Sequence, residues 1–193
     1  MALRDDVDHV EAPDAATWRA WLEENHATAP SVWLVYWKRA TGRPSVTWSE
    51  AVDEALCFGW IDTTVRSLGP ERHQQYFTPR SPTGTWSRIN KAKIERLLAD
   101  GLMHPAGLRA VETAKANGSW DALTDADGHV LPDDLAVALA AEPGAQATFD
   151  AYTPWVRSRT IYRVTSAKRP ATRAGRIEAV VAAAARGERP PGL

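Results

Sequence analysis

The stretch EALCFGWID, residues 54–62, brings together the thiol of Cys57, the indole of Trp60 and the carboxylate of Asp62. A nucleophilic cysteine needs its thiolate form, which a helix N-terminus or a nearby histidine or lysine favours. Cys57 instead follows Leu56 and precedes Phe58, at the C-terminal end of a predicted helix, where the helix dipole disfavours a thiolate. We therefore expect Cys57 to be buried and structural, with nucleophilic catalysis as the alternative.

Asp62 and Arg80 belong to the segments WIDTTVRSL and QQYFTPR, which are typical of two paired strands around the turn GPERH. If the turn is centred on Glu71, Asp62 and Arg80 face each other across the ladder. They then form either an ordinary cross-strand ion pair or one wall of a ligand pocket. Trp60 lies on the same side of its strand as Asp62, because side chains alternate along a strand.

Asn90 interrupts an apolar stripe formed by Trp86, Ile94 and Leu97, which share one face of a predicted helix. A carboxamide in that position needs hydrogen-bond partners. It either holds the preceding loop PRSPTGTWS or, with Trp86, forms a second pocket wall beside Arg80. The candidate ligand-binding residues are Trp60, Asp62, Arg80, Trp86 and Asn90, and no catalytic residue is assigned.

Other kinds of site have little support in the sequence. The five histidines are scattered and the chain has one cysteine, so we predict no metal site. Neither a glycine-rich phosphate loop nor a G-x-S-x-G elbow occurs, and no cofactor is predicted.

A basic run extends from Arg157 to Arg176 with no acidic residue within it. It is typical of a solvated helix pair, with contact to an anion or to nucleic acid as the alternative. The chain as a whole has 23 basic and 24 acidic residues, a net charge of −1, so we expect no nucleic-acid partner.

The elements that position these residues predict an α+β fold. A helix follows Asp14, the strand SVWLVYWKR has apolar residues on both faces, and a second helix begins with the capping box of Thr47 and Glu50. We place Trp48 in the apolar core stripe of that second helix. The expected sheet is small and antiparallel, with about three strands, and is packed with helices. Residues 1–120 form this α+β portion and residues 121–193 a helical portion with a basic helix pair bent at Pro170, both within one compact unit.

Length and composition indicate a soluble globular protein. Its 193 residues include no stretch of about 20 apolar residues, so no membrane partner is expected. The acidic start MALRDDVDHV is unlike a secretory signal, and we therefore predict a cytoplasmic location. Nine tryptophans are explained either by packing or by an aromatic ligand surface.

The order of several motifs resembles the YdeI/OmpD-associated family, also called the bacteriocin-protection family. The motifs are EALCFGWID, FTPR, WSRIN, GLMHPAGL, AKANGSW and SAKRPATRAGRI, and the resemblance covers about residues 15–190. It implies a soluble bacterial protein that protects against bacteriocins or cationic antimicrobial peptides. It also implies that Cys57 and the five candidate ligand-binding residues fall in the family's signature positions.

Three functional hypotheses follow. The first is a protective protein that binds a small polar or aromatic ligand, or a peptide, in a pocket lined by tryptophan, aspartate and arginine. The second is an enzyme that uses Asp62 and Arg80, or Cys57. The third is an interaction module whose basic C-terminal helices dock on an acidic partner.

Overall fold

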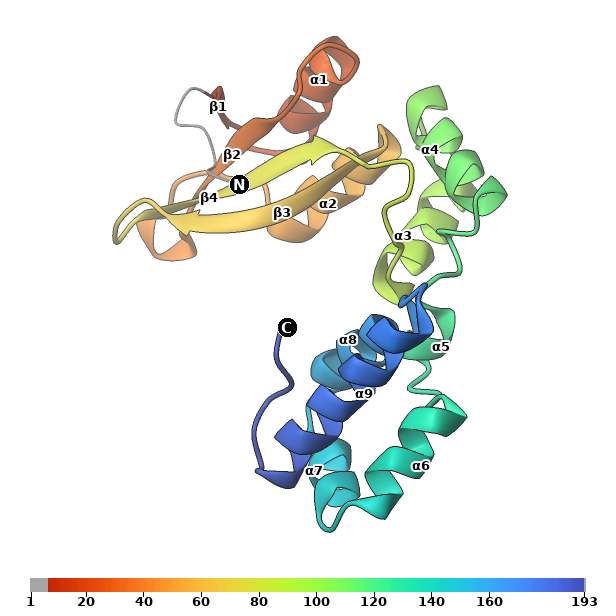
Figure 1. The fold of residues 1–193 in the computed structure, drawn as a ribbon. Coiled ribbons are helices and arrows are strands. Elements are labelled where there is room, and N and C mark those ends of the chain that lie inside the picture. Colours follow the sequence, from red (N-terminus) through yellow and green to blue (C-terminus); the bar gives the residue numbers. More distant parts are fainter. Residues whose placement is uncertain (1–6, 193) are drawn as a thin grey trace. The chain divides into compact units, whose positions relative to one another are not determined.

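The computed structural model describes residues 7–192, apart from the side chain of residue 125. These residues divide into two compact units (Figure 1). Unit 1 comprises residues up to 84 together with 89–118, and unit 2 comprises residues 85–88 and those from 119 onward. The predicted division into portions 1–120 and 121–193 within one compact unit stays a prediction. Residues 1–6, on which the predicted absence of a secretory signal partly depends, lie outside the described residues.

Unit 1 contains a four-stranded sheet in the order β1-β2-β4-β3. The strands are β1 (His9–Glu11), β2 (Val32–Trp37), β3 (Trp60–Ser67) and β4 (Arg72–Pro79). The α+β class is confirmed, and β2, β4 and β3 form the expected antiparallel sheet. The short strand β1 was not predicted, and it pairs with β2 in parallel, so the sheet is mixed.

The β3–β4 hairpin has a different register from the predicted one. Asp62 faces Phe77, not Arg80, and Arg80 follows the last residue of β4. The prediction was wrong for two reasons. The turn is centred near Pro70, since Ser67 pairs with His73, and an irregularity between Asp62 and Val65 adds a further one-residue shift.

Helices α1 (Ala15–Asn25) and α2 (Trp48–Cys57) pack on one face of this sheet, and their starts follow the sequence. The carboxylate of Asp14 accepts the amide of Thr17, and the capping box of Thr47 and Glu50 is present. The side chain of Trp18 connects both helices to the sheet. It packs against Phe77 with ring centroids 5.3 Å apart, and its Nε1 donates to the carbonyl of Ala51 over 3.0 Å.

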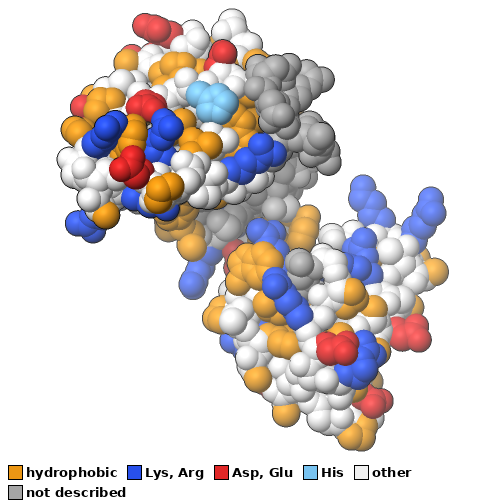
Figure 2. Space-filling view, turned by 90° about the vertical axis from the view of Figure 1, so that its left-hand side faces the viewer, with side chains coloured by type: hydrophobic (Ala, Val, Ile, Leu, Met, Phe, Trp, Pro, Cys, Tyr) orange, Lys and Arg blue, Asp and Glu red, His pale blue; other side chains and the backbone are white. Residues whose placement is uncertain are grey.

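Unit 1 also contains the short 3₁₀ helix η1 (Arg39–Thr41), all of α3 (Arg88–Ala99) except its first residue, and α4 (Pro105–Ala116). Helix α3 is tied to α2 by ion pairs, because Asp53 accepts Lys93 at 2.6 Å and Arg96 at 2.5 Å. Figure 2 shows acidic, basic and apolar side chains mixed over the visible face of unit 1.

Unit 2 is helical, as predicted. Its helices are α5 (Thr124–Asp127), α6 (Asp133–Ala141), α7 (Ala145–Ala151), α8 (Pro154–Thr165) and α9 (Pro170–Ala185). Their common core contains Leu135, Leu139, Phe149, Ile161 and Val180. The basic helix pair corresponds to α8 and α9, and Pro170 occupies the first turn of α9, where its missing N–H costs nothing.

Residues 7–192 contain neither a helix suited to span a membrane nor a cluster of metal-ligating side chains. None of the helices in this range has both the length and the apolar character needed to cross a bilayer. Within the same range, no group of three or more histidine, cysteine, aspartate or glutamate side chains is arranged to hold a metal ion.

Candidate functional site

Asp62 lies on the helix-covered face of β3, where two neutral donors hold one of its carboxylate oxygens. Oδ2 accepts the indole Nε1 of Trp48 over 3.2 Å and the amide Nε2 of Gln75 over 2.5 Å. Gln75 is buried, whereas Asp62 is half-buried. Among the described residues, nothing donates a hydrogen bond to Oδ1 of Asp62. This oxygen therefore retains its full capacity to accept a hydrogen bond from a ligand.

Tyr36 provides a second polar group near this carboxylate. Its ring stacks on His73, with centroids 4.9 Å apart and planes 5° apart. Its hydroxyl is buried and has no hydrogen-bond partner in the part of the chain that the structure describes. Burial, and secondarily the negative charge of Asp62, raises the pKa of Tyr36, so the phenol remains protonated and can donate.

Arg80 brings positive charge to the same corner. Its backbone amide donates to the carbonyl of Gly59 over 2.9 Å, which fixes the chain just after β4. Burial lowers the pKa of Arg80 to about 10, and the nearby charge of Asp62 opposes that shift. The guanidinium is therefore charged at neutral pH. Asp62 and Arg80 are not cross-strand partners, and that they act as a pair stays a prediction. We call Tyr36, Trp48, Asp62, Gln75 and Arg80 the Asp62 corner.

The other predicted ligand-binding residues have different surroundings. Trp60 is almost fully buried, stacks edge-on against Trp21 at 5.8 Å, and donates its Nε1 to the carbonyl of His26. Trp86 is buried in unit 2 beside Trp120, at 5.0 Å, and Asn90 is half-buried in α3. That the five predicted residues share one pocket stays a prediction.

Cys57 is fully buried, as expected. Burial, with a smaller contribution from the charge of Glu54, raises the pKa of its thiol to about 11, although Arg19 acts in the opposite direction. The thiol is therefore protonated at neutral pH, which fits the structural interpretation of Cys57.

Tyr36, Trp48 and Gln75 were not predicted as members of this site. Trp48 was placed in the core, but it is 51% exposed and turns its indole N–H toward Asp62. Its position as the first residue of α2 was the available signal, since a side chain in the first turn can reach beyond the helix. Tyr36 and Gln75 gave no local signal, because only strand pairing brings them near Asp62.

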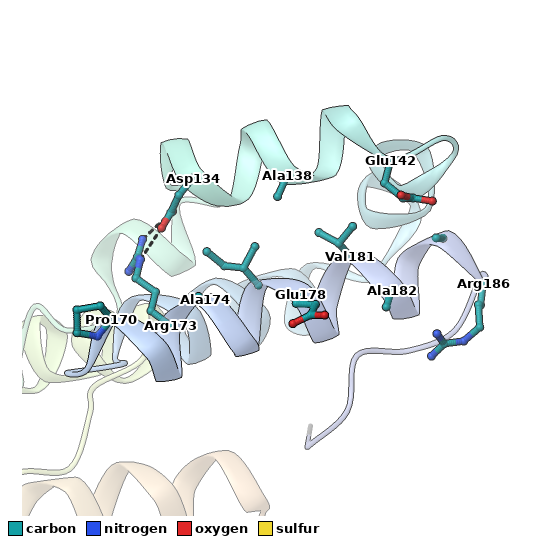
Figure 3. A pocket seen from close by; sticks show the side chains of 12 residues that line it. Asp134, Ala138, Glu142, Pro170, Arg173, Ala174, Glu178, Val181, Ala182 and Arg186 are labelled. Atoms are coloured by element: carbon teal, nitrogen blue, oxygen red, sulfur yellow. Dashed lines mark hydrogen bonds and ion pairs between the residues drawn. The ribbon is translucent and has the colours of Figure 1, made fainter.

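A separate groove of about 820 Å³ lies between α6 and α9 of unit 2 (Figure 3). Ala138 and Val181 point toward each other across it, and Ala174 and Ala182 extend its small apolar surface along α9. One end is closed by a bidentate ion pair, in which Arg173 contacts Asp134 over 2.6 and 2.8 Å.

The rim of this groove also carries Glu142 and Glu178, which take part in no ion pair among the described residues. Arg186 also lines the groove but pairs with Glu188 over 2.8 Å, so the groove combines an apolar floor with these two carboxylates, which are unpaired among the described residues.

Two family models match different parts of the chain, and the boundary between them lies near the boundary between units 1 and 2. Residues 10–110 match the model of DUF8412, a domain of unknown function. The chain belongs to this family. Residues 129–187 match a second model, described as bacteriocin-protection, YdeI or OmpD-associated. No curated protein and no solved structure matches the chain.

The predicted resemblance to the bacteriocin-protection family is thus confirmed for residues 129–187. It does not extend over residues 15–190 as expected, since the motifs EALCFGWID, FTPR and WSRIN lie in the DUF8412 segment. The Asp62 corner belongs to the DUF8412 segment, and the α6–α9 groove lies in the bacteriocin-protection segment.

Proposed function

We propose that the protein has a bacteriocin-protection-like role and exerts it by binding a small polar or aromatic ligand at the Asp62 corner. The role is suggested by the family match of residues 129–187. The observation that carries the choice of site is that neither Oδ1 of the half-buried Asp62 nor the hydroxyl of Tyr36 has a hydrogen-bond partner among the described residues. Buried polar groups are normally hydrogen-bonded, and a ligand is one way to complete these two.

The chemistry of the corner defines the ligand class. Asp62 can accept a hydrogen bond from an N–H or ammonium group of the ligand, and Tyr36 can donate one to a ligand acceptor. Arg80 attracts a ligand carboxylate. The half-exposed indole of Trp48 offers an aromatic surface beside these groups. A small zwitterion or amide that carries an aromatic ring can interact with all four of these side chains.

Calorimetric titration at neutral pH with three related probes tests this assignment. L-Tryptophan has both charges, tryptamine lacks the carboxylate, and indolepropionate lacks the ammonium group. We expect L-tryptophan to bind saturably and more tightly than either relative. Asp62→Asn should weaken this binding by about tenfold or more, because a hydrogen bond to a charged group contributes about 1.5–3 kcal/mol.

The matched control is Glu112→Gln, which removes the same charge from an exposed position of unit 1. It should bind L-tryptophan as the parent protein does. Absence of saturable binding for all three probes, or equal weakening in the two variants, would rule out the Asp62 corner as this ligand site.

The α6–α9 groove supports a second candidate, the binding of a basic amphipathic helix. Its position within the bacteriocin-protection segment favours this reading. Helix α9 has 16 residues and is about 24 Å long, and its small side chains allow another helix to approach closely. Glu142 and Glu178 complement lysine or arginine residues at the edge of such a helix.

A fluorescently labelled amphipathic helix of leucine and lysine provides the probe. We expect it to bind the protein in a salt-sensitive manner, and Glu178→Lys to weaken that binding by about tenfold. A leucine–glutamate helix of the same pattern should not bind. Glu112→Lys, an equal charge change in unit 1, should leave the affinity unchanged; a similar loss there would show that net charge alone attracts the peptide.

A further inference from the structure

A hollow of about 570 Å³ in unit 2 is lined by three arginine side chains. Arg159, Arg163 and Arg176 contribute the guanidinium groups, and Trp155, Tyr162 and Ser166 complete most of the surface. We call it the arginine hollow. No aspartate or glutamate is among its described lining residues. It therefore concentrates positive charge with no acidic side chain in its wall.

Helix geometry explains why these residues converge. Trp155, Arg159 and Arg163 follow one another at intervals of four residues along α8, so they share one face of that helix. Arg176 reaches the same place from α9. Three arginines of the predicted basic run therefore line one hollow and do not merely cover a solvated helix surface.

Two of the three arginines are held in place by neutral groups. Arg163 donates from Nη1 to the carbonyl of Pro191 over 2.5 Å. Arg176 donates from Nη1 to the carbonyl of Arg163 over 2.5 Å and to Oγ of Ser166 over 3.4 Å. These bonds fix the side chains without neutralising their charge, which leaves further N–H donors on each guanidinium.

Arg159 differs from its neighbours because its guanidinium takes part in no ion pair or hydrogen bond within residues 7–192. Its side chain is half-buried, as are those of Arg163 and Arg176. Like charges gathered in a partly desolvated site repel one another unless an anion is present. Tyr162 and Ser166 line the same wall, and the hydroxyl of Ser166 donates to the carbonyl of Arg163 over 3.3 Å.

We propose that the arginine hollow is a binding site for a phosphate group, either free or carried as an ester. A tetrahedral oxyanion has several acceptor oxygens that match the planar donor forks of arginine. The half-exposed indole of Trp155 borders the site and can contact the organic part of an ester. The site is distinct from the Asp62 corner and does not depend on the function proposed there.

Titration of the full chain with inorganic phosphate, at constant ionic strength maintained with chloride, tests this proposal. We expect saturable binding by calorimetry and a rise in the thermal unfolding midpoint that chloride alone does not produce. Arg159→Gln should weaken phosphate binding by about tenfold or more without lowering the unliganded midpoint, since this side chain makes no bond within the described protein and its removal relieves charge repulsion.

The matched control is Arg169→Gln, which removes an exposed arginine of the same basic run that does not line the hollow. It should bind phosphate like the parent protein. Equal losses in the two variants, or a response to phosphate that does not saturate, would overturn the proposal in favour of general surface charge.

A second probe, adenosine monophosphate, separates the two forms of the ligand. Equal affinity for it and for inorganic phosphate assigns the hollow to the phosphate group alone. A higher affinity that Trp155→Ala removes assigns it to a phosphate ester with a ring. Failure of both probes to bind would contradict the proposal.

Discussion

Gly107→Ala is expected to destabilise unit 1 by about 3 kcal/mol, because there is no room for a methyl group at this position. An added Cβ would lie 2.2 Å from the carbonyl oxygen of Cys57 and 2.9 Å from that of Leu56. Both are backbone atoms at the end of α2, which cannot turn aside as a flexible side chain can. Helix α4 would have to move away from α2.

Gly175→Ala is the matched control for this prediction. Gly175 lies within α9, and an added Cβ there would have no atom within 4 Å. Alanine should therefore stabilise the helix by about 0.5–1 kcal/mol. Urea unfolding followed by circular dichroism measures both changes. Equal effects of the two substitutions would show that α4 does not approach α2 as closely as described.

Trp18→Ala is expected to cost about 3–5 kcal/mol, the range observed when large aromatic side chains are removed from a core. The Trp18 indole is fully buried, stacks on Trp21 with centroids 5.2 Å apart, and packs against Phe77. Its removal also leaves the buried carbonyl of Ala51 without its side-chain donor. This residue connects α1, α2 and the sheet, so its loss should affect the whole helix-covered face.

Two further substitutions separate the contributions to this loss. Trp18→Phe retains much of the packing and removes the hydrogen bond, and we expect it to cost less than Trp18→Ala. Trp155→Ala removes a tryptophan that is 52% exposed and should cost under about 1 kcal/mol. If Trp18→Ala were as mild as Trp155→Ala, the packing role assigned to the buried tryptophans would be wrong.

Local sequence signals predicted much of the fold. The side chains of Asp14, Thr47 and Glu50 cap α1 and α2 as expected, because capping depends on residues close together in the chain. The apolar run of β2 is buried on both faces, also as expected. The strand β1 has three residues, too few for an alternating pattern to be visible.

The candidate site was harder to predict because it depends on strand register. An irregularity between Asp62 and Val65 shifts the pairs of Trp60, Ile61 and Asp62 by one residue relative to the pairs nearer the turn, and no turn signal in the sequence announced it. Asp62 and Arg80 were chosen because the predicted register placed them opposite each other, and the structure has another register, so their role as ligand-binding residues stays a prediction. Tyr36 and Gln75 resembled ordinary strand residues, and only the tertiary structure connects them with Asp62.

The most direct test of the proposed function is the survival of sensitive bacteria that produce this protein during challenge with a bacteriocin. Four variants at equal cellular levels are compared: the parent chain, Asp62→Asn, Glu178→Lys and Glu112→Gln. We expect protection by the parent, by Glu112→Gln and by Glu178→Lys, and its loss in Asp62→Asn. Full protection by Asp62→Asn would contradict the assignment of the Asp62 corner, and its loss in Glu178→Lys alone would transfer the function to the α6–α9 groove.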